Sequence, residues 1–262
     1  MKTIKINLKP DTLHEEVVKF DQRALDQPLF LNSVPKCGSH LMRNIIRMFV
    51  PLDKQYSAQF VQQQILHEHL GAFSDPRNLL SWGHLMFTDM TAVAVGRARH
   101  ILLVRDPYDW VLARARFFIS DEFQGMELLK EGSLSVEAIL NMMILGIHEK
   151  APPLASLFTY NAVAWLGTGV HLVHYEDLVA AVKDIDGNGA ESFFSDLFDA
   201  CGIVRPDDWR ERVRIGSDRK HSGTASEHLT GTKVELPKKL SDLHKRMVDF
   251  GGPGLRDLLG YK

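Results

Sequence analysis

The sequence predicts an α/β fold with a central, mostly parallel sheet flanked by helices. Short apolar runs of strand length recur along the chain, at 29–34, 79–84, 101–104 and 170–175. Segments with apolar residues at helical spacing separate these runs. Strands that alternate with helices are typical of parallel sheets, whose ligand crevice lies at the carboxyl ends of the strands.

Composition limits the classes of protein to which the chain can belong. Its 262 residues are 45% hydrophobic and contain no repeat, so we expect one domain over 1–262 with one large core. The formal charge of −2 and the pI near 6.6 argue against bulk attraction to nucleic acid or anionic lipid. We therefore expect neither nucleic acid nor a membrane as a partner, and any anion site must be local.

Cysteine usage and the N-terminus indicate a cytoplasmic protein. Cys37 and Cys201 are the only cysteines, too few for a disulfide framework or a cysteine metal site. Residues 1–8 alternate polar and apolar without the apolar stretch of a signal peptide, and no later run approaches membrane-spanning length.

The first part of the chain predicts two peripheral elements and then the main strand. Residues 3–8 alternate like a short strand, and 11–24 predict a helix opened by an Asp cap. The buried strand at 29–34 ends at Pro35, because proline cannot continue a central strand. An amphipathic helix over 41–49 follows.

The middle of the chain repeats this pattern. A helix is predicted over 58–70 and a strand over 79–84 that runs into a loop at His84. After a small-residue helix at 91–98 comes the clearest buried strand, 101–104. It ends in Arg105-Asp106-Pro107, where proline suits the first turn of the next helix.

The last part is mostly helical apart from the strand at 170–175. The expected helices lie at 135–149, 153–165, 190–200, 206–212 and 236–259. Residues 214–232 are rich in Ser, Thr, Gly and basic residues. They form either a disordered surface loop or a flap that a ligand orders.

The turn at 36–40 is a candidate anion site. Gly38 tolerates backbone angles that other residues avoid. Such a turn directs backbone N–H groups and the positive end of a helix dipole at one point, with Lys36 beside it. Every strand-to-helix unit has a similar turn, so a plain structural turn is the alternative. His84, Arg105 and Tyr175 also directly follow or end predicted strands, so we expect all four side chains at one sheet edge.

In these residues the chain resembles the sulfotransferases that use 3′-phosphoadenosine 5′-phosphosulfate (PAPS). Residues 35–41 match the family's first motif, P-K-S-G-T-T-W, in its Pro, Lys and Gly and in the hydroxyl of Ser39. The departures are Cys37, His40 and Leu41. Residues 104–109 match the second motif, an apolar strand followed by R-[DN]-P-x-D.

Three further islands agree in order. Gly83-His84-Leu85 resembles the segment with the family's catalytic His, and Tyr175-Glu176-Asp177-Leu178 matches its Y-E-D-L segment. Residues 219–230 resemble the family's late flap with one deletion, and this match is the weakest. The Ser that usually helps to bind the 3′-phosphate falls on Ala113, so that ligand is missing or supplied by Arg114 or another side chain.

The resemblance implies an enzyme with the P-loop-like sulfotransferase fold. It would move a sulfuryl group from PAPS to a hydroxyl or amine of a small-molecule acceptor, leaving adenosine 3′,5′-bisphosphate (PAP), without a metal. It also implies which residues line the nucleotide site: Lys36, Cys37, Gly38, Ser39, His40, Leu41, Arg105, Ala113, Tyr175, Arg219 and Lys220. A homodimer is left open.

The expected roles follow from the chemistry and the resemblance together. Lys36 would stabilise charge on the leaving oxygen, and His84 would take the acceptor proton, with His40 as a competitor for that role. Arg105 and the flap pair 219–220 would bind the 3′-phosphate. Each has a structural alternative: a solvated Lys, a hydrogen-bonded His or a salt-bridged Arg. Tyr175 lies near the adenine or fills the edge of the core.

Two other functions stay open. A P-loop kinase shares the phosphate-binding turn, but it expects G-x-x-x-x-G-K-[ST], whereas Lys36 precedes Gly38 here. A catalytically silent nucleotide-binding protein of the same fold would explain the departures at Cys37 and Ala113.

Overall fold

Five parallel strands form the central sheet of the protein. The computed structural model describes residues 5–6, 11–120, 123–124, 126–221 and 233–262. The strand order is β3-β4-β2-β5-β7. The bounds are β2 Leu29–Ser33, β3 Gln55–Val61, β4 Leu80–Gly83, β5 Arg99–Val104 and β7 His171–His174. A separate antiparallel pair joins β1 (Lys5–Ile6) to β6 (Phe123–Gln124). The predicted parallel α/β fold is therefore confirmed.

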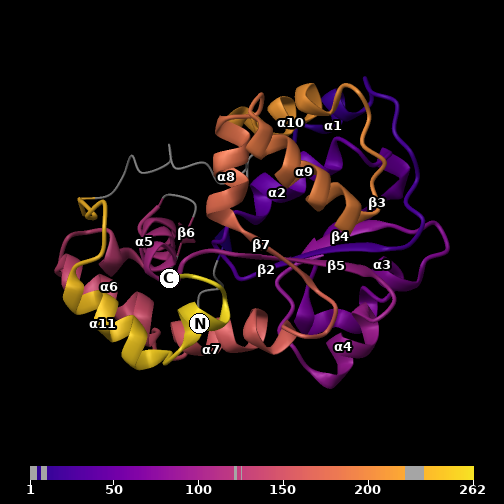
Figure 1. The fold of residues 1–262 in the computed structure, drawn as a ribbon. Coiled ribbons are helices and arrows are strands. Elements are labelled where there is room, and N and C mark those ends of the chain that lie inside the picture. The colour runs from indigo at the N-terminus through magenta and orange to yellow at the C-terminus, as the bar shows by residue number, and fades with distance from the viewer. Residues whose placement is uncertain (1–4, 7–10, 121–122, 125, 222–232) are drawn as a thin grey trace.

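Helices cover both faces of this sheet (Figure 1). Their bounds are α1 His14–Val17, α2 Ser39–Arg47, α3 Gly71–Ser74, α4 Asp89–Val95, α5 Pro107–Phe118, α6 Val136–Leu145, α7 Leu154–Asn161, α8 Tyr175–Lys183, α9 Asn188–Cys201, α10 Trp209–Ser217, α11 Asp242–Gly251 and α12 Leu255–Leu258. Helices α2, α8, α9 and α10 lie above the sheet in Figure 1, and α4 and α7 lie below it. Short 3₁₀ turns occur at Leu52–Lys54, Gln63–Glu68, Glu127–Leu129, Val163–Trp165 and Arg219–His221.

The core forms around β2, the middle strand. Leu29, Phe30 and Leu31 are at most 2% exposed, because helices cover both faces of the strand. A strand that is buried on both faces needs a continuous apolar run, which is the pattern found at this position.

One helix prediction is wrong and several bounds are too long. Residues 58–70 form the end of β3 and a 3₁₀ turn, because parallel pairing with β4 overrides the local helical spacing. Of the helix expected over 11–24, only the four residues of α1 are helical. Gly146, at φ +91°, ends α6 before residue 149. Helix α8, which begins at Tyr175, was not predicted.

Candidate active site

The register of the parallel strands decides which side chains meet at the sheet edge. Asn32 of β2 pairs with Gly83 of β4, and Val104 of β5 pairs with His174 of β7. The next residue on each strand is therefore also a neighbour. This places Ser33 beside His84 and Arg105 beside Tyr175.

The turn after β2 is closely packed against α8. Gly38 has φ +93°, and a Cβ at this position would overlap with ring carbons of Tyr175. Both the backbone angle and the contact therefore require glycine. On the other side, the Trp110 indole N–H donates to the Pro35 carbonyl at 2.6 Å, which fixes the turn to α5.

Lys36 holds an uncommon backbone conformation within this turn. Its φ of +71° is in the left-handed region, where a residue with a side chain costs about 1–3 kcal/mol. Its Nζ lies 3.0 Å from the centroid of the Phe117 ring on α5. The ammonium group is thus directed from β2 towards the helix that follows β5.

His84 is oriented by β2. Its Nδ1 lies 3.0 Å from both the carbonyl oxygen and the Oγ of Ser33. A carbonyl can only accept, so Nδ1 carries the hydrogen and Nε2 keeps a lone pair. Burial lowers the pKa of His84 to about 4, and the Lys36 charge also lowers it. The ring is therefore neutral at pH 7 and can accept a proton at Nε2.

Asn32 fixes the backbone that follows His84. Its side-chain amide donates to the Leu85 carbonyl at 3.1 Å, and its oxygen accepts from the Leu85 N–H at 2.9 Å. Asn32 is fully buried, and sequence analysis did not single it out. Its polar side chain within an apolar strand run was the available signal.

His40 lies in the turn but is not oriented in the same way. Its Nδ1 is buried without a hydrogen-bond partner among the described residues, and its ring packs edge-on against Trp82 at 5.2 Å. Burial, followed by the charge of Arg43, lowers the pKa of His40 to about 3. His84 is thus the better-positioned base of the two.

Cys37, Ser39 and Leu41, in and just after the turn, carry no charge at neutral pH. Cys37 is fully buried, and burial raises the pKa of its thiol. Ser39 begins α2 at 8% exposure, and Leu41 packs against the core. The groups at this turn that could bind an anion are therefore the backbone N–H groups, the Lys36 ammonium and the Ser39 hydroxyl.

Arg105 stacks on Tyr175. The guanidinium carbon lies 4.5 Å from the ring centroid, and Arg105 Nε is buried without a partner. No ion pair of Arg105 occurs among the described residues. Its donors therefore remain available to an anion, and the salt-bridge alternative for Arg105 finds no support here.

Both Nη atoms of Arg114 are engaged within the fold. Its guanidinium donates to the carbonyls of Met143 at 2.7 Å and Pro152 at 2.8 Å, which ties α5 to the chain around α6. Arg116 is the better candidate for a phosphate ligand, because it lies three residues after Ala113 and thus on the same helix face. Burial, followed by the charge of Arg105, lowers the pKa of Arg116. Sequence analysis missed it.

The flap pair lies on an anchored turn. The Asn44 amide of α2 donates to the His221 carbonyl at 2.9 Å, which fixes the 3₁₀ turn of Arg219–His221 against α2. Arg219 and Lys220 are exposed, and Lys220 pairs with Asp218 at 3.2 Å. Residues 222–232 of the expected flap lie outside the described residues.

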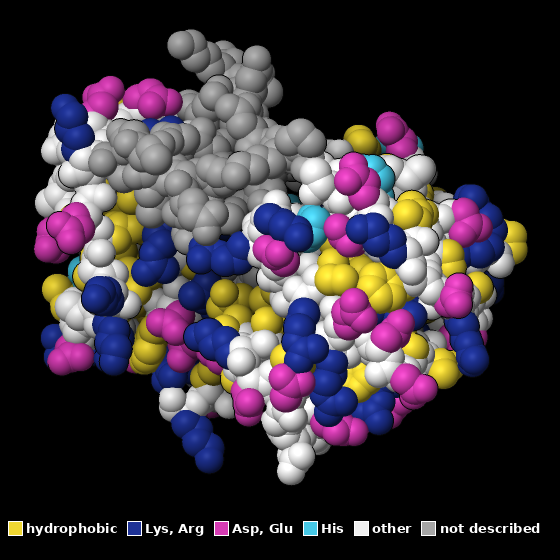
Figure 2. Space-filling view, turned by 90° about the horizontal axis from the view of Figure 1, so that it is seen from above, with side chains coloured by type: hydrophobic (Ala, Val, Ile, Leu, Met, Phe, Trp, Pro, Cys, Tyr) yellow, Lys and Arg dark blue, Asp and Glu magenta, His cyan; other side chains and the backbone are white. Residues whose placement is uncertain are grey.

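Basic side chains gather on the face seen in Figure 2, where several surround an apolar hollow beside the grey residues.

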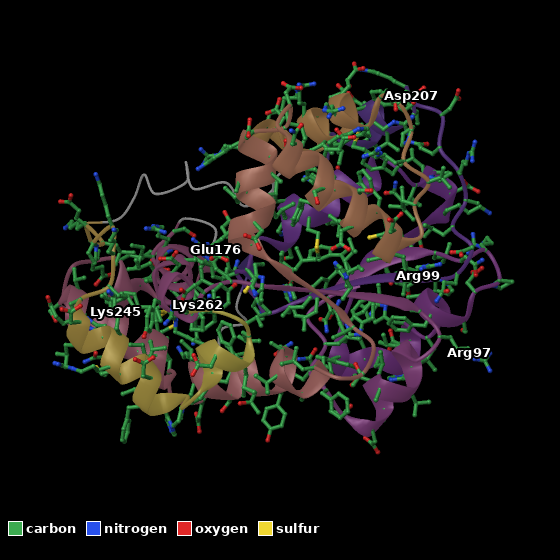
Figure 3. All side chains as sticks on the ribbon, viewed as in Figure 1. Arg97, Arg99, Glu176, Asp207, Lys245 and Lys262 are labelled. Carbon is green, nitrogen blue, oxygen red and sulfur yellow. The ribbon has the colours of Figure 1, made fainter. Side chains whose placement is uncertain are left out.

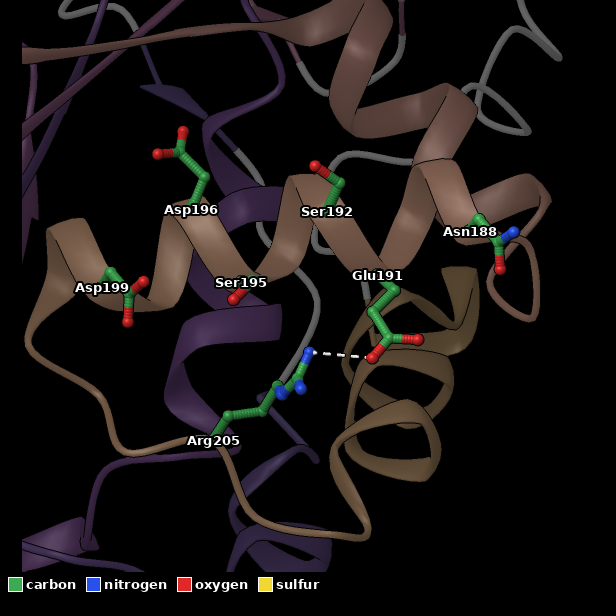
Figure 4. A pocket seen from close by; sticks show the side chains of 7 residues that line it. All are labelled: Asn188, Glu191, Ser192, Ser195, Asp196, Asp199 and Arg205. Atoms are coloured by element: carbon green, nitrogen blue, oxygen red, sulfur yellow. Dashed lines mark ion pairs between the residues drawn. The ribbon is translucent and has the colours of Figure 1, made fainter.

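A separate recess lies along α9 and is lined by carboxylates of Glu191, Asp196 and Asp199 (Figure 4). Arg205 pairs with Glu191 there at 3.4 Å. Its lining residues all lie between 188 and 205 and include none of Lys36, His84, Arg105 and Tyr175.

The described residues include neither a metal-binding cluster nor a membrane-spanning helix. In the described ranges, no three His, Cys, Asp or Glu side chains group together so that they could hold a metal ion. Nor does any helix among these residues have the length and apolarity needed to cross a membrane.

Comparison with known proteins identifies the fold. No family model matches the chain, and no curated protein is significantly similar to it. Among solved structures, mouse sulfotransferase SULT7A1 complexed with PAP is 16% identical, with a TM-score of 0.55; the match covers 94% of this chain and 92% of that chain. Retinol dehydratase in complex with androsterone and the inactive cofactor PAP is 12% identical, covers 98% of this chain and 96% of that chain, and has a TM-score of 0.49. The match to the SULT7A1 structure shows that the chain has the sulfotransferase fold, as the sequence resemblance implied.

Proposed function

We propose that the protein is a sulfotransferase that moves a sulfuryl group from PAPS to a hydroxyl or amine of a small-molecule acceptor. The observation that supports this most is the contact of Tyr175 with both Gly38 and Arg105. It joins an anion-binding turn to a guanidinium at the carboxyl ends of β2 and β5. The fold shared with a sulfotransferase that was crystallised with PAP supports the same reading.

The residues present fit a nucleotide with a phosphate at each end. Backbone N–H groups of the turn at 36–40 suit the 5′ end, because they stand at the N-terminus of α2. The buried, unpartnered Nε of Arg105 suits the 3′-phosphate, and Arg116 supplies a second cation. Tyr175 offers a ring face near the adenine.

Each reacting group then has a residue assigned to it. PAPS supplies the sulfuryl group when it is bound. Lys36 stabilises negative charge on the oxygen that leaves sulfur, and His84 Nε2 takes the proton of the attacking acceptor. The acceptor's bond to sulfur forms as the bond from sulfur to the phosphate oxygen breaks, so that PAP is released. Ser33 keeps His84 in the tautomer that this role needs.

The acceptor side of the site is aromatic. Phe60 and Trp82 stand edge-on to the His84 ring, with centroids 5.3 and 6.2 Å away. An apolar acceptor would therefore fit beside the base. Incubation with PAPS and a panel of phenols, alcohols and amines tests the function: formation of PAP with a sulfated product is expected. PAP binding without turnover on any acceptor would favour the silent alternative.

A further inference from the structure

The segment 255–262 contacts the residues that adjoin both members of the stacked pair formed by Arg105 and Tyr175. It begins with α12 and is anchored by Leu255 and Leu259, which are at most 5% exposed. His174, the residue before Tyr175, lies with its Nε2 2.6 Å from the Leu259 carbonyl. The segment therefore has a defined position beside the ends of β5 and β7.

Arg256 holds the residue that follows Arg105. Its Nε and Nη2 donate to the two carboxylate oxygens of Asp106 at 3.2 and 3.0 Å. Both side chains are about one-fifth exposed, so the pair is partly shielded from water. Asp106 in turn caps α5 through the Tyr108 N–H at 2.9 Å. The Arg256 guanidinium also stacks on the Tyr108 ring at 4.1 Å.

Tyr261 holds the residue that follows Tyr175. Its hydroxyl donates to Glu176 Oε2 at 3.0 Å, while Glu176 Oε1 accepts the Asp106 N–H at 3.2 Å. Burial and the neighbouring Glu176 raise the pKa of Tyr261, so the hydroxyl remains a donor. Figure 3 shows Glu176 at the start of α8 near Lys262, the neighbour of Tyr261.

We propose that Arg256 and Tyr261 are positioning residues of the donor site. Asp106 and Glu176 each follow one member of the stacked pair, and segment 255–262 links the two carboxylates. Arg256 also neutralises Asp106, whose carboxylate would otherwise be uncompensated one residue away from Arg105. Arg105 therefore keeps its donors for the ligand, in the orientation that Tyr175 sets.

This inference rests on the proposed function and predicts a selective loss of binding. Arg256→Ala should weaken the binding of PAP about tenfold, because the Asp106 carboxylate, released from its ion pair, then competes with the phosphate for Arg105. The affinity for AMP, which lacks the 3′-phosphate, should change less than about twofold. The exposed Arg246→Ala on α11 is the matched control and should bind both nucleotides like the wild type. Asp106→Asn in the Arg256→Ala background should recover part of the PAP affinity.

Calorimetric titration tests the inference. Five proteins are each titrated with PAP and with AMP. These are the wild type, Arg256→Ala, its Asp106→Asn double variant, Tyr261→Phe and Arg246→Ala. Tyr261→Phe removes one hydroxyl and covers the case in which Arg256→Ala does not fold; its PAP affinity should fall several-fold. Unchanged PAP affinity in folded Arg256→Ala or Tyr261→Phe, or equal losses for PAP and AMP, would overturn the positioning role while leaving the function intact. A wild type that binds no PAP would overturn both.

Discussion

The guanidinium carbon of Arg105 lies 4.5 Å from the ring centroid of Tyr175, and the same ring fills the space above Gly38. One aromatic side chain thereby joins the turn after β2 to the residue that follows β5, which are 67 residues apart at Gly38 and Arg105. The turn at 36–40 and the Arg105 guanidinium therefore lie against the same ring.

Removing the Arg105 side chain should weaken the binding of nucleotides that carry a 3′-phosphate more than the binding of nucleotides that lack one. Arg105→Ala should weaken the binding of PAP at least ~10-fold more than the binding of AMP, because a charge-assisted hydrogen bond to the 3′-phosphate is lost. Titration of both nucleotides measures the ratio. Equal losses would remove Arg105 from the 3′ site. Arg114→Ala is not a control for binding, because its donors support the fold.

Arg116 should contribute to the same phosphate. Arg116→Ala should also reduce PAP affinity more than AMP affinity, by a factor of about 3–10 for one partly buried cation. Ala113→Ser in that background should restore part of the loss, since it returns the hydroxyl that the motif usually carries. Wild-type affinity for PAP in Arg116→Ala would show that another group compensates for Ala113.

Loss of the Lys36 charge should affect turnover rather than folding. Lys36→Met keeps a long side chain but removes the cation, so turnover should fall at least ~10²-fold. The thermal unfolding midpoint should stay close to that of the wild type. Lys150→Met, at an exposed position, is the matched control. A Lys36→Met variant with wild-type turnover would exclude Lys36 from the mechanism.

The fall of kcat/KM at acid pH should reflect the protonation of His84. Protonation destroys the base, so kcat/KM should hold from neutral pH down to about pH 5 and fall below it, following the pKa of about 4. An ordinary histidine would produce the fall near pH 6.5. His84→Gln should lower turnover about 10²–10⁴-fold, whereas His40→Gln should change it far less. Full activity of His84→Gln at every pH would transfer the role elsewhere.

Gly38 should be intolerant of any side chain. Gly38→Ala meets the Tyr175 ring and adopts φ +93°, so the free energy of unfolding should drop by about 1–3 kcal/mol, and PAP affinity should drop with it. Gly189→Ala on α9 is the control, because a Cβ there meets nothing within 4 Å. A Gly38→Ala variant with wild-type stability would contradict the packing described for the turn.

The parts predictable from sequence were those encoded by local pattern. Buried runs such as 101–104 are short and wholly apolar, so their strands and the residues that follow them were found. Strand β3 was missed because its pairing with β4 is a tertiary effect. The contacts of His84 with Ser33 and of Arg105 with Tyr175 depend on strand register, which no local pattern specifies.

Helical geometry alone would have favoured Arg116 over Arg114 as the candidate that replaces the side chain missing at Ala113. A residue three positions after Ala113 shares its face, whereas the next residue is turned by about 100°. The role of segment 255–262 could not be inferred in this way, since its contacts with Asp106 and Glu176 span 150 and 85 residues.

Calorimetric titration of the wild type with PAP and with ATP, in buffer containing a metal chelator, tests the central claim most directly. The proposed donor site predicts saturable binding of PAP, at least ~10-fold tighter than ATP, because only PAP carries the 3′-phosphate that Arg105 and Arg116 address. Absence of PAP binding, or tighter binding of ATP that requires Mg²⁺, would contradict it.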